Sequence, residues 1–448
     1  MAFPSPVRTA LAHAGAALLV AGLTACSDGP VAGGAGAAAA DATPTATDTA
    51  ARAGDGAGGD GSATVDTGTA DTSGADASTA ETAALDSAGG DTGPTPSGLP
   101  FAVGLLKFEV AGPGKRALPT LVWYPTPKGS KGAVTSYLAG LIASPLGAIE
   151  NAAPAPGPFP TVTFSHGNQG VPDQSVYLTE GLAARGYVVV APEHVGNSFL
   201  TYDDKLLAAM VIWRPQDLKA AVDRLAKPDA KDPTWLKGLA DTEKLAVAGH
   251  SFGGYTALAY AGVVVSPLPQ FVPKCAGVAK GDAVCDLMQE IGPPPWNLGD
   301  PRVDLSIPLA HALTAGFDVK SLKEHQVPIV LAAAKGDAVT PYASEAKAAY
   351  DKMDAPKALL TVENGGHFSF AHPCELAAVA PPLLQKEVKT LCAADASPSI
   401  PETHGAVLAI AAAACDVYLK GNDARRQDLA PGPVAGLPIA LQSVGIVK

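Results

Sequence analysis

The most distinctive feature of this 448-residue sequence is what residues 27–98 lack. They contain no aromatic residue, and Val31, Val65 and Leu85 are their only larger aliphatic residues. Such a segment cannot bury enough apolar surface to offset the entropy that is lost on ordering it. We therefore predict that residues 27–98, which are mostly Ala, Gly, Thr, Ser, Asp and Pro, form a disordered tether.

Positive charge is also scarce in this segment, which carries ten Asp and Glu81 against Arg52 alone. The formal net charge of the whole chain is −12, so most of the acidity belongs to the predicted tether. The charge therefore does not indicate a basic substrate, and we expect no nucleic-acid partner. A solvated, self-repelling spacer that holds a domain away from a membrane is the simplest use of such a segment.

The N-terminus has no apolar run of transmembrane length. The stretch from Ala10 to Leu23 is too short to span a bilayer comfortably and follows the positively charged Arg8, so residues 1–26 read as an export signal. Leu23-Thr24-Ala25-Cys26 resembles the lipobox of bacterial lipoproteins, in which the cysteine is acylated. The alternative is an ordinary secretory signal cleaved near Ala25. Either way we expect export, as a membrane-anchored lipoprotein of the bacterial cell envelope or as a secreted protein.

Cysteine is rare, and no spacing resembles a zinc site, so we expect neither a metal nor a cofactor. Five cysteines follow Cys26: Cys275, Cys285, Cys374, Cys392 and Cys415. An exported protein can form disulfides, and the candidate pairs are Cys275 with Cys285 and Cys374 with Cys392. The alternative is that all five are reduced. The last cysteine lies in an apolar helical stretch and is expected to be a buried free thiol.

Residues 99–448 alternate strand-like and helix-like segments, which predicts one domain of the α/β class with a mostly parallel sheet and helices on both faces. An antiparallel hairpin is expected at its start. The predicted strands are 101–110, 118–124, 160–168, 187–190, 245–248, 303–310, 327–334 and 358–362. The predicted helices are 177–185, 204–225 with a kink or boundary at Arg214-Pro215, 255–264, 344–353 and 403–420.

The stretch Gly249-His250-Ser251-Phe252-Gly253 fits the G-x-S-x-G nucleophile elbow, in which a serine sits on a sharp strand-to-helix turn. The two glycines remove β-carbons that would clash where this turn closes. The turn presents the Ser251 hydroxyl as a nucleophile, and it points the N–H of Phe252 at the place where an oxyanion would form.

A serine hydroxyl needs a base, and His367 is the candidate. It lies in Glu363-Asn364-Gly365-Gly366-His367-Phe368, a loop after the last predicted strand, from which an imidazole can reach the edge of the sheet. His372 is the second candidate for this role.

The base needs an orienting acid, and Asp337 follows the strand that precedes the histidine loop. The alternative reading of Gly336-Asp337 is a simple turn. Asp300, Asp304 and Asp318 are weaker candidates for the acid.

The oxyanion needs a second donor. Phe164-Ser165-His166-Gly167-Asn168 ends a strand with a glycine, and the backbone N–H of Asn168 would join that of Phe252.

Together these segments resemble the α/β-hydrolase superfamily from about Leu99 to Leu419, and within it the predicted dienelactone hydrolases and the bacterial relatives of platelet-activating factor acetylhydrolase. The residues that carry the resemblance are Val122-Trp123-Tyr124-Pro125, Phe164-Ser165-His166-Gly167, Arg214-Pro215-Gln216-Asp217, Gly249 to Gly254, Gly336-Asp337 and Gly366-His367-Phe368. The resemblance implies a serine hydrolase of carboxylic esters, with Ser251, Asp337 and His367 as the catalytic triad and Asn168 and Phe252 as oxyanion donors.

The sequence departs from these families at two places. Dienelactone hydrolases use a cysteine nucleophile where this chain has Ser251, so lactone hydrolysis is not expected. In the acetylhydrolases the acid follows the strand after the elbow, but here that position reads Pro308-Leu309-Ala310-His311-Ala312-Leu313, without a carboxylate. Asp337 is left as the acid, and a phospholipid substrate is less favoured.

The insertion at about 266–300 is expected to form a lid or rim over the site, where Trp296 and Phe252 could line an acyl pocket. The alternative for Trp296 is packing on its own prolines. The expected substrate is a small-molecule or lipid ester. The alternatives are a polyester or amide hydrolase that uses the same three residues, and a catalytically silent surface-binding protein of the same fold.

Overall fold

The structure, a computed structural model, describes residues 98–272, 274–275, 281–374, 399–434 and 436–446. The predicted signal with Cys26, residues 27–97 of the predicted tether, and Cys392 lie outside the described residues.

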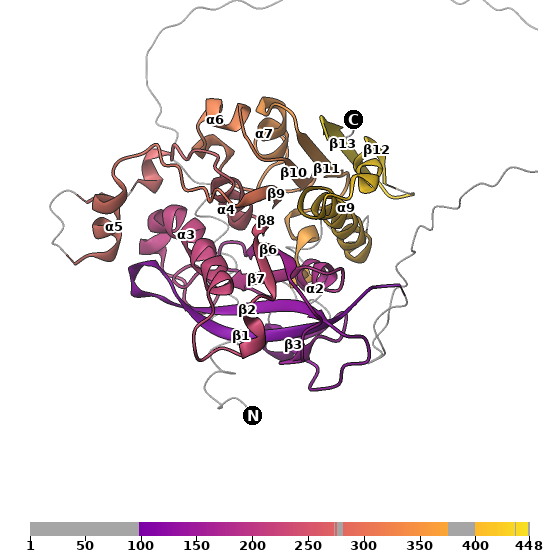
Figure 1. Ribbon diagram of the computed structural model, residues 1–448. Helices are drawn as coiled ribbons and strands as arrows, with labels where there is room; N and C mark the ends of the chain where they lie inside the picture. The colour runs from indigo at the N-terminus through magenta and orange to yellow at the C-terminus, as the bar shows by residue number, and fades with distance from the viewer. Residues whose placement is uncertain (1–97, 273, 276–280, 375–398, 435, 447–448) are drawn as a thin grey trace, which may run out of the picture. The chain divides into compact units, whose positions relative to one another are not determined.

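Among the described residues, eleven strands form one sheet in the order β12-β13-β11-β10-β9-β8-β6-β7-β2-β1-β5 (Figure 1). Its centre is parallel throughout. The central strands are β6 (Phe159–Ser165), β7 (Val188–Pro192), β8 (Ala240–His250), β9 (Val303–Leu309), β10 (Ile329–Ala334) and β11 (Lys357–Val362). Apart from the first part of β8, these strands are almost wholly buried, as expected for parallel strands covered on both faces.

The two ends of the sheet are antiparallel. The predicted hairpin is present as β1 (Ala102–Ala111) and β2 (Ala117–Thr126), and β2 pairs with β7. At the other end β13 (Ile439–Val444) pairs with β11 and with β12 (Gly432–Pro433), an extension that was not predicted. The short strand β5 (Ile149–Glu150) pairs with β1, whereas β3 (Ser136–Tyr137) and β4 (Ile142–Ala143) form a separate small sheet.

Helices cover both faces of the sheet, which confirms the predicted fold class. One face packs against α2 (Val176–Ala183) and α9 (Ile400–Lys420), and the other against α3 (Leu207–Ala226), α4 (Phe252–Tyr260) and α7 (Ala346–Lys352). The remaining α-helices among the described residues are α5 (Ala283–Ile291) and α6 (Val319–Lys323). Short 3₁₀ helices occur at Pro113–Lys115, Leu138–Gly140, Asp204–Leu206, Thr234–Leu236, Pro269–Phe271, Thr314–Gly316, His367–Phe370 and Asp423–Leu429.

Helix α9 has well-defined ends. Ser399 and Glu402 form a capping box at its start, and Gly421 ends it in the left-handed conformation at φ 67°. The helix is long and apolar enough to cross a membrane, but 67% of its most apolar window is buried inside the domain, as in a core helix.

Helix α3 runs through Pro215 instead of ending there. Proline has no N–H, so the carbonyl of Val211, one turn earlier, loses its helical donor. The Tyr255 hydroxyl on α4 donates to that carbonyl at 3.0 Å. Because this side chain replaces the missing bond, α3 continues past its proline.

Candidate active site

Ser251 occupies the turn between β8 and α4, with φ 60° and ψ −121°. A positive φ in a residue other than glycine is strained and is typical of functional turns. A β-carbon on Gly249 would lie 2.2 Å from the carbonyl oxygen of Gly253, and one on Gly253 would lie 1.9 Å from that of Ser165. Only glycine fits at these two positions. The sharp turn expected from the sequence is therefore present.

Asp337 and His367 are in direct contact, although they are distant in the sequence. Asp337 follows β10, His367 follows β11, and His367 Nδ1 lies 2.8 Å from Asp337 Oδ2. The other carboxylate oxygen accepts from the backbone N–H groups of Val339 and Thr340, each at 2.8 Å. Burial would raise the pKa of Asp337, but the interaction with His367 and the Thr340 hydrogen bonds outweigh it and lower that pKa. Asp337 is therefore held as a carboxylate.

A third residue, Thr340, contacts both Asp337 and His367. It was not singled out from the sequence. Its hydroxyl lies 2.7 Å from Asp337 Oδ2 and 3.0 Å from the Ala310 carbonyl oxygen, and it can donate to either. It also lies 3.1 Å from His367 Nδ1, from which it can accept. Thr340 thus fixes both members of the pair and ties them to the end of β9.

The histidine loop is joined to the serine turn through His250. The Nε2–H of His250 donates to the backbone carbonyl of His367 at 2.9 Å, and the two rings lie 4.7 Å apart between centroids. Burial lowers the pKa of His250 to about 3, so this ring is neutral at ordinary pH. Ser251, Asp337 and His367 follow the carboxyl ends of β8, β10 and β11, and such ends meet at one edge of a parallel sheet.

The weaker acid and base candidates have other contacts. Asp300 precedes β9, at the opposite edge of the sheet, and pairs with Arg302 and Tyr260. Asp304 accepts from the backbone N–H of Leu245, and Asp318 caps α6. His372 accepts from the backbone N–H of Tyr177 on α2.

The loop after β6 lies against the serine turn. A β-carbon on Gly167 would be 3.3 Å from the Ser251 β-carbon, so the two segments are in close contact. Among the described residues, neither the backbone N–H of Asn168 nor that of Phe252 donates to a protein acceptor. Both N–H groups are therefore available to an incoming oxygen.

A hydrogen-bonded chain holds this loop in place. The Gly167 N–H donates to Gln174 Oε1 at 3.0 Å, and Gln174 Nε2 donates to His250 Nδ1 at 3.0 Å. Because His250 in turn bonds to the carbonyl of His367, one chain of contacts connects the loop after β6, the serine turn and the histidine loop. Gln174 was missed by sequence reasoning, since only tertiary structure brings it to this point.

A buried polar cluster lies behind the loop. Asp217 on α3 accepts from Arg116 at 2.5 and 3.1 Å and from His194 Nδ1 at 2.9 Å. His194 Nε2 lies 2.9 Å from the Ser165 hydroxyl, which can donate to it. Burial lowers the pKa of His194 well below its usual range, which agrees with this neutral tautomer.

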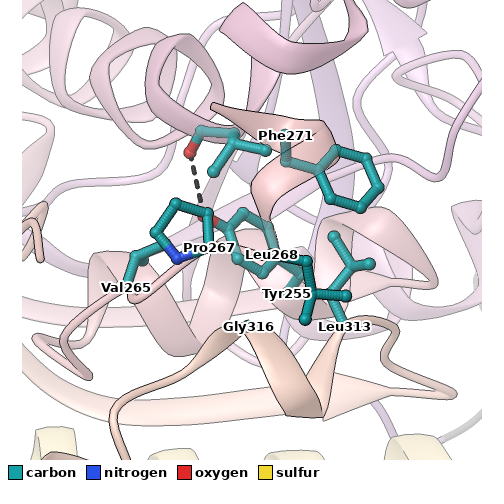
Figure 2. Close-up of a pocket in the computed structure, with 8 residues that line it drawn as sticks. Tyr255, Val265, Pro267, Leu268, Phe271, Leu313 and Gly316 are labelled. Atoms are coloured by element: carbon teal, nitrogen blue, oxygen red, sulfur yellow. Dashed lines mark hydrogen bonds between the residues drawn. The ribbon is translucent and has the colours of Figure 1, made fainter. Parts of the chain in front are cut away.

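An apolar cavity lies beside α4 (Figure 2). It is a small cavity of about 10 Å³, room for about one water molecule. Its lining comes from α3, α4, the segment after α4 and the loop after β9: Val211, Tyr255, Val265, Pro267, Leu268, Phe271, Leu313 and Gly316. Tyr255 donates its backbone N–H to the Ser251 carbonyl at 3.2 Å, and Ala312, next to Leu313, does the same at 3.2 Å. One lining residue and the chain neighbour of another are therefore bonded directly to the serine turn.

The sequence left two possibilities for Trp296, an acyl pocket or packing on its own prolines, and Trp296 is not among the residues that line this cavity. Its side chain is buried, and its indole N–H donates to the Gly292 carbonyl at 2.9 Å. Its backbone pairs with Val265. The tryptophan therefore belongs to the apolar core on the face of the sheet that α4 covers. Phe252, the other expected pocket residue, has its ring 4.7 Å from the Arg214 guanidinium carbon and is also not among the lining residues.

The first predicted disulfide, between Cys275 and Cys285, is present. Cys374 is also disulfide-bonded, while its predicted partner Cys392 lies outside the described residues. Cys415 is a buried free thiol, as expected. Within the described ranges, no group of three or more His, Cys, Asp or Glu side chains is arranged to hold a metal ion.

Comparisons with known proteins agree with this architecture. Residues 142–271, which include the loop after β6 and the serine turn, match the family model described as Chlorophyllase. No curated protein matches the chain. Among solved structures, a ferulic acid esterase from Streptomyces cinnamoneus is similar, with 21% identity, a TM-score of 0.55, and coverage of 80% of this chain and 100% of that one. The chain thus has the α/β-hydrolase fold, with its serine turn at the expected edge of the sheet.

Proposed function

We propose that this protein is a serine hydrolase that cleaves carboxylic esters. The observation that carries the proposal is the buried Asp337–His367 pair at the same sheet edge as Ser251, which sits on a strained turn. The Chlorophyllase match and the ferulic acid esterase neighbour support an ester substrate over other acyl compounds.

In the proposed reaction the Ser251 Oγ attacks the ester carbonyl carbon while its proton passes to His367 Nε2. This is the free ring nitrogen, because Nδ1 is bonded to Asp337. The electron pair of the carbonyl moves to its oxygen, which the N–H groups of Asn168 and Phe252 stabilise. The intermediate then expels the alcohol, which takes the proton from His367. Water repeats the same steps on the acyl-enzyme, releasing the acid and restoring Ser251.

The side chains around the small cavity beside α4 form an apolar surface, which favours an ester with an apolar group. All of its side chains are apolar except Tyr255, and the Tyr255 hydroxyl is already bonded to the Val211 carbonyl. A charged substituent placed there would lose its hydration without finding a partner. p-Nitrophenyl butyrate is therefore a suitable first substrate.

The test is Ser251→Ala, assayed with p-nitrophenyl butyrate and with a fluorophosphonate probe. We expect the wild type to hydrolyse the ester and to be labelled on Ser251. We expect the variant to lose at least about 10³-fold in kcat and to lose all labelling, while its far-UV circular dichroism is unchanged. Full activity in the variant would refute the assignment. Labelling without ester hydrolysis would favour an amide or polyester substrate, and a wild type that neither reacts nor labels would favour a surface-binding protein.

We further propose that the protein is exported and held at a membrane by a lipid on Cys26, with residues 27–98 as the spacer. The sequence Leu23-Thr24-Ala25-Cys26 supports this proposal. The corresponding measurement is partitioning of the protein into the detergent phase of Triton X-114.

A further inference from the structure

Arg214 is a completely buried arginine on α3, behind the loop after β6. Its guanidinium donates to four acceptors. They are Thr256 Oγ1 at 3.1 Å, Asn197 Oδ1 at 2.6 Å, Ser165 Oγ at 3.1 Å and the backbone carbonyl of His166. Every acceptor is neutral, and no carboxylate among the described residues accepts a hydrogen bond from this side chain.

The charges around Arg214 do not cancel. Asp217 is the nearest carboxylate, but its oxygens are occupied by Arg116 and His194. Burial and the charge of Arg214 hold the pKa values of His166 and His194 well below their usual range, so both imidazoles are neutral. Burial lowers the pKa of Arg214 to about 9, which leaves it charged at pH 7. Two guanidinium groups therefore share one carboxylate, and an excess positive charge is buried.

Burying an uncompensated charge costs free energy, and the contacts of Arg214 show which segments this charge lies against. The His166 carbonyl that it holds lies two residues before Asn168, one of the two available N–H donors. Asn197, which it also contacts, donates to Asn168 Oδ1 at 2.7 Å. The same guanidinium lies over the Phe252 ring and bonds to Thr256, whose hydroxyl also lies 2.9 Å from the Phe252 carbonyl oxygen. Arg214 thus touches the segments that carry both donors.

We propose that Arg214 is a positioning residue for the oxyanion donors, and that its uncompensated charge stabilises the anionic intermediate from behind Asn168 and Phe252. This inference rests on the proposed ester hydrolysis. Negative charge develops on the carbonyl oxygen only as the serine attacks, so Arg214 should act on the intermediate much more than on the neutral substrate.

Two variants separate the charge from the geometry. Arg214→Met removes the charge with a side chain of similar length. Asn197→Asp keeps Arg214 but places a carboxylate at the position 2.6 Å from its guanidinium, while Asn168 can turn its own amide to donate to that carboxylate. The matched control is Arg302→Met, which removes a partly buried arginine paired with Asp300 at the opposite edge of the sheet.

The readouts are kcat and KM for p-nitrophenyl butyrate, the affinity for a boronic acid that forms a tetrahedral anion on serine, and the rate of fluorophosphonate labelling. Loss of one direct oxyanion donor costs about 100- to 1,000-fold in kcat. We expect kcat to fall about 10- to 100-fold in Arg214→Met and about 10-fold in Asn197→Asp. KM should change less than about 3-fold, and boronic acid affinity should fall in parallel with kcat. Arg302→Met should lose thermal stability without losing kcat.

If Arg214→Met does not fold, Asn197→Asp alone decides the question. Unchanged kcat in Asn197→Asp, a rise in KM alone, or an equal loss of kcat in Arg302→Met would each overturn the inference. A wild type that is labelled at the same rate as both variants would overturn it while leaving the proposed function intact. A wild type that neither hydrolyses esters nor labels would overturn both.

Discussion

Replacing Thr340 by valine tests whether the Thr340 hydroxyl is needed to orient Asp337 and His367. Valine keeps the shape of threonine and deletes only the hydroxyl that lies 2.7 Å from Asp337 Oδ2 and 3.1 Å from His367 Nδ1. Asp337 keeps its bond to His367 and two backbone donors, so one of its four hydrogen bonds is lost.

The magnitude follows from these contacts. A hydrogen bond to a charged group contributes about 1.5 to 3 kcal/mol, and the three remaining bonds to Asp337 compensate in part. We expect the free energy of unfolding to fall by about 1 to 2 kcal/mol. We expect kcat to fall about 10-fold, equivalent to about 1.4 kcal/mol, because the carboxylate then orients the imidazole less firmly.

The assay is kcat and KM for p-nitrophenyl butyrate together with urea denaturation. Thr340→Ser is the control, because it restores the hydroxyl and removes only a methyl group, and it should keep kcat within about 3-fold of the wild type. The reasoning fails if Thr340→Val retains full kcat, or if serine and valine impair the enzyme equally.

Two further predictions concern pH and membrane attachment. Burial lowers the pKa of His311 to about 4, whereas its pKa in the unfolded chain is about 6.5. Between these two pH values the unfolded state binds more protons than the folded state. The folded protein therefore loses stability as the pH falls from about 6.5 to about 4. From pH 7 to pH 5, protonation of His311 should lower the free energy of unfolding by about 2 kcal/mol. In chemical denaturation, His311→Leu should therefore lose about 2 kcal/mol less than the wild type over this range. Equal losses in the two proteins would contradict the argument. Cys26→Ser should move the protein from the detergent phase of Triton X-114 to the aqueous phase, and unchanged partitioning would exclude a lipid on Cys26.

The sequence was most informative where the geometry is local. The glycines around Ser251 predict a sharp turn because only a residue without a β-carbon fits there, and Asp337 and His367 could be chosen because each follows a predicted strand. Parallel strands then bring such loops to one edge of the sheet.

Residues that act across the fold were harder to predict. Gln174 and Thr340 carry no local signal, because their roles depend on partners distant in the sequence. Arg214 was noted as part of a motif, but its buried, unpaired charge emerges only from the contacts. Two possibilities stayed open for Trp296, because a tryptophan in a proline-rich insertion gives no indication of the direction in which it packs.

The proline in α3 has a consequence for the cavity. Because Pro215 has no N–H, the Val211 carbonyl can accept a hydrogen bond from the Tyr255 hydroxyl. This bond links α3 to α4. Val211 and Tyr255 are both lining residues. Part of the cavity wall is therefore fixed by a hydrogen bond between two helices of the domain.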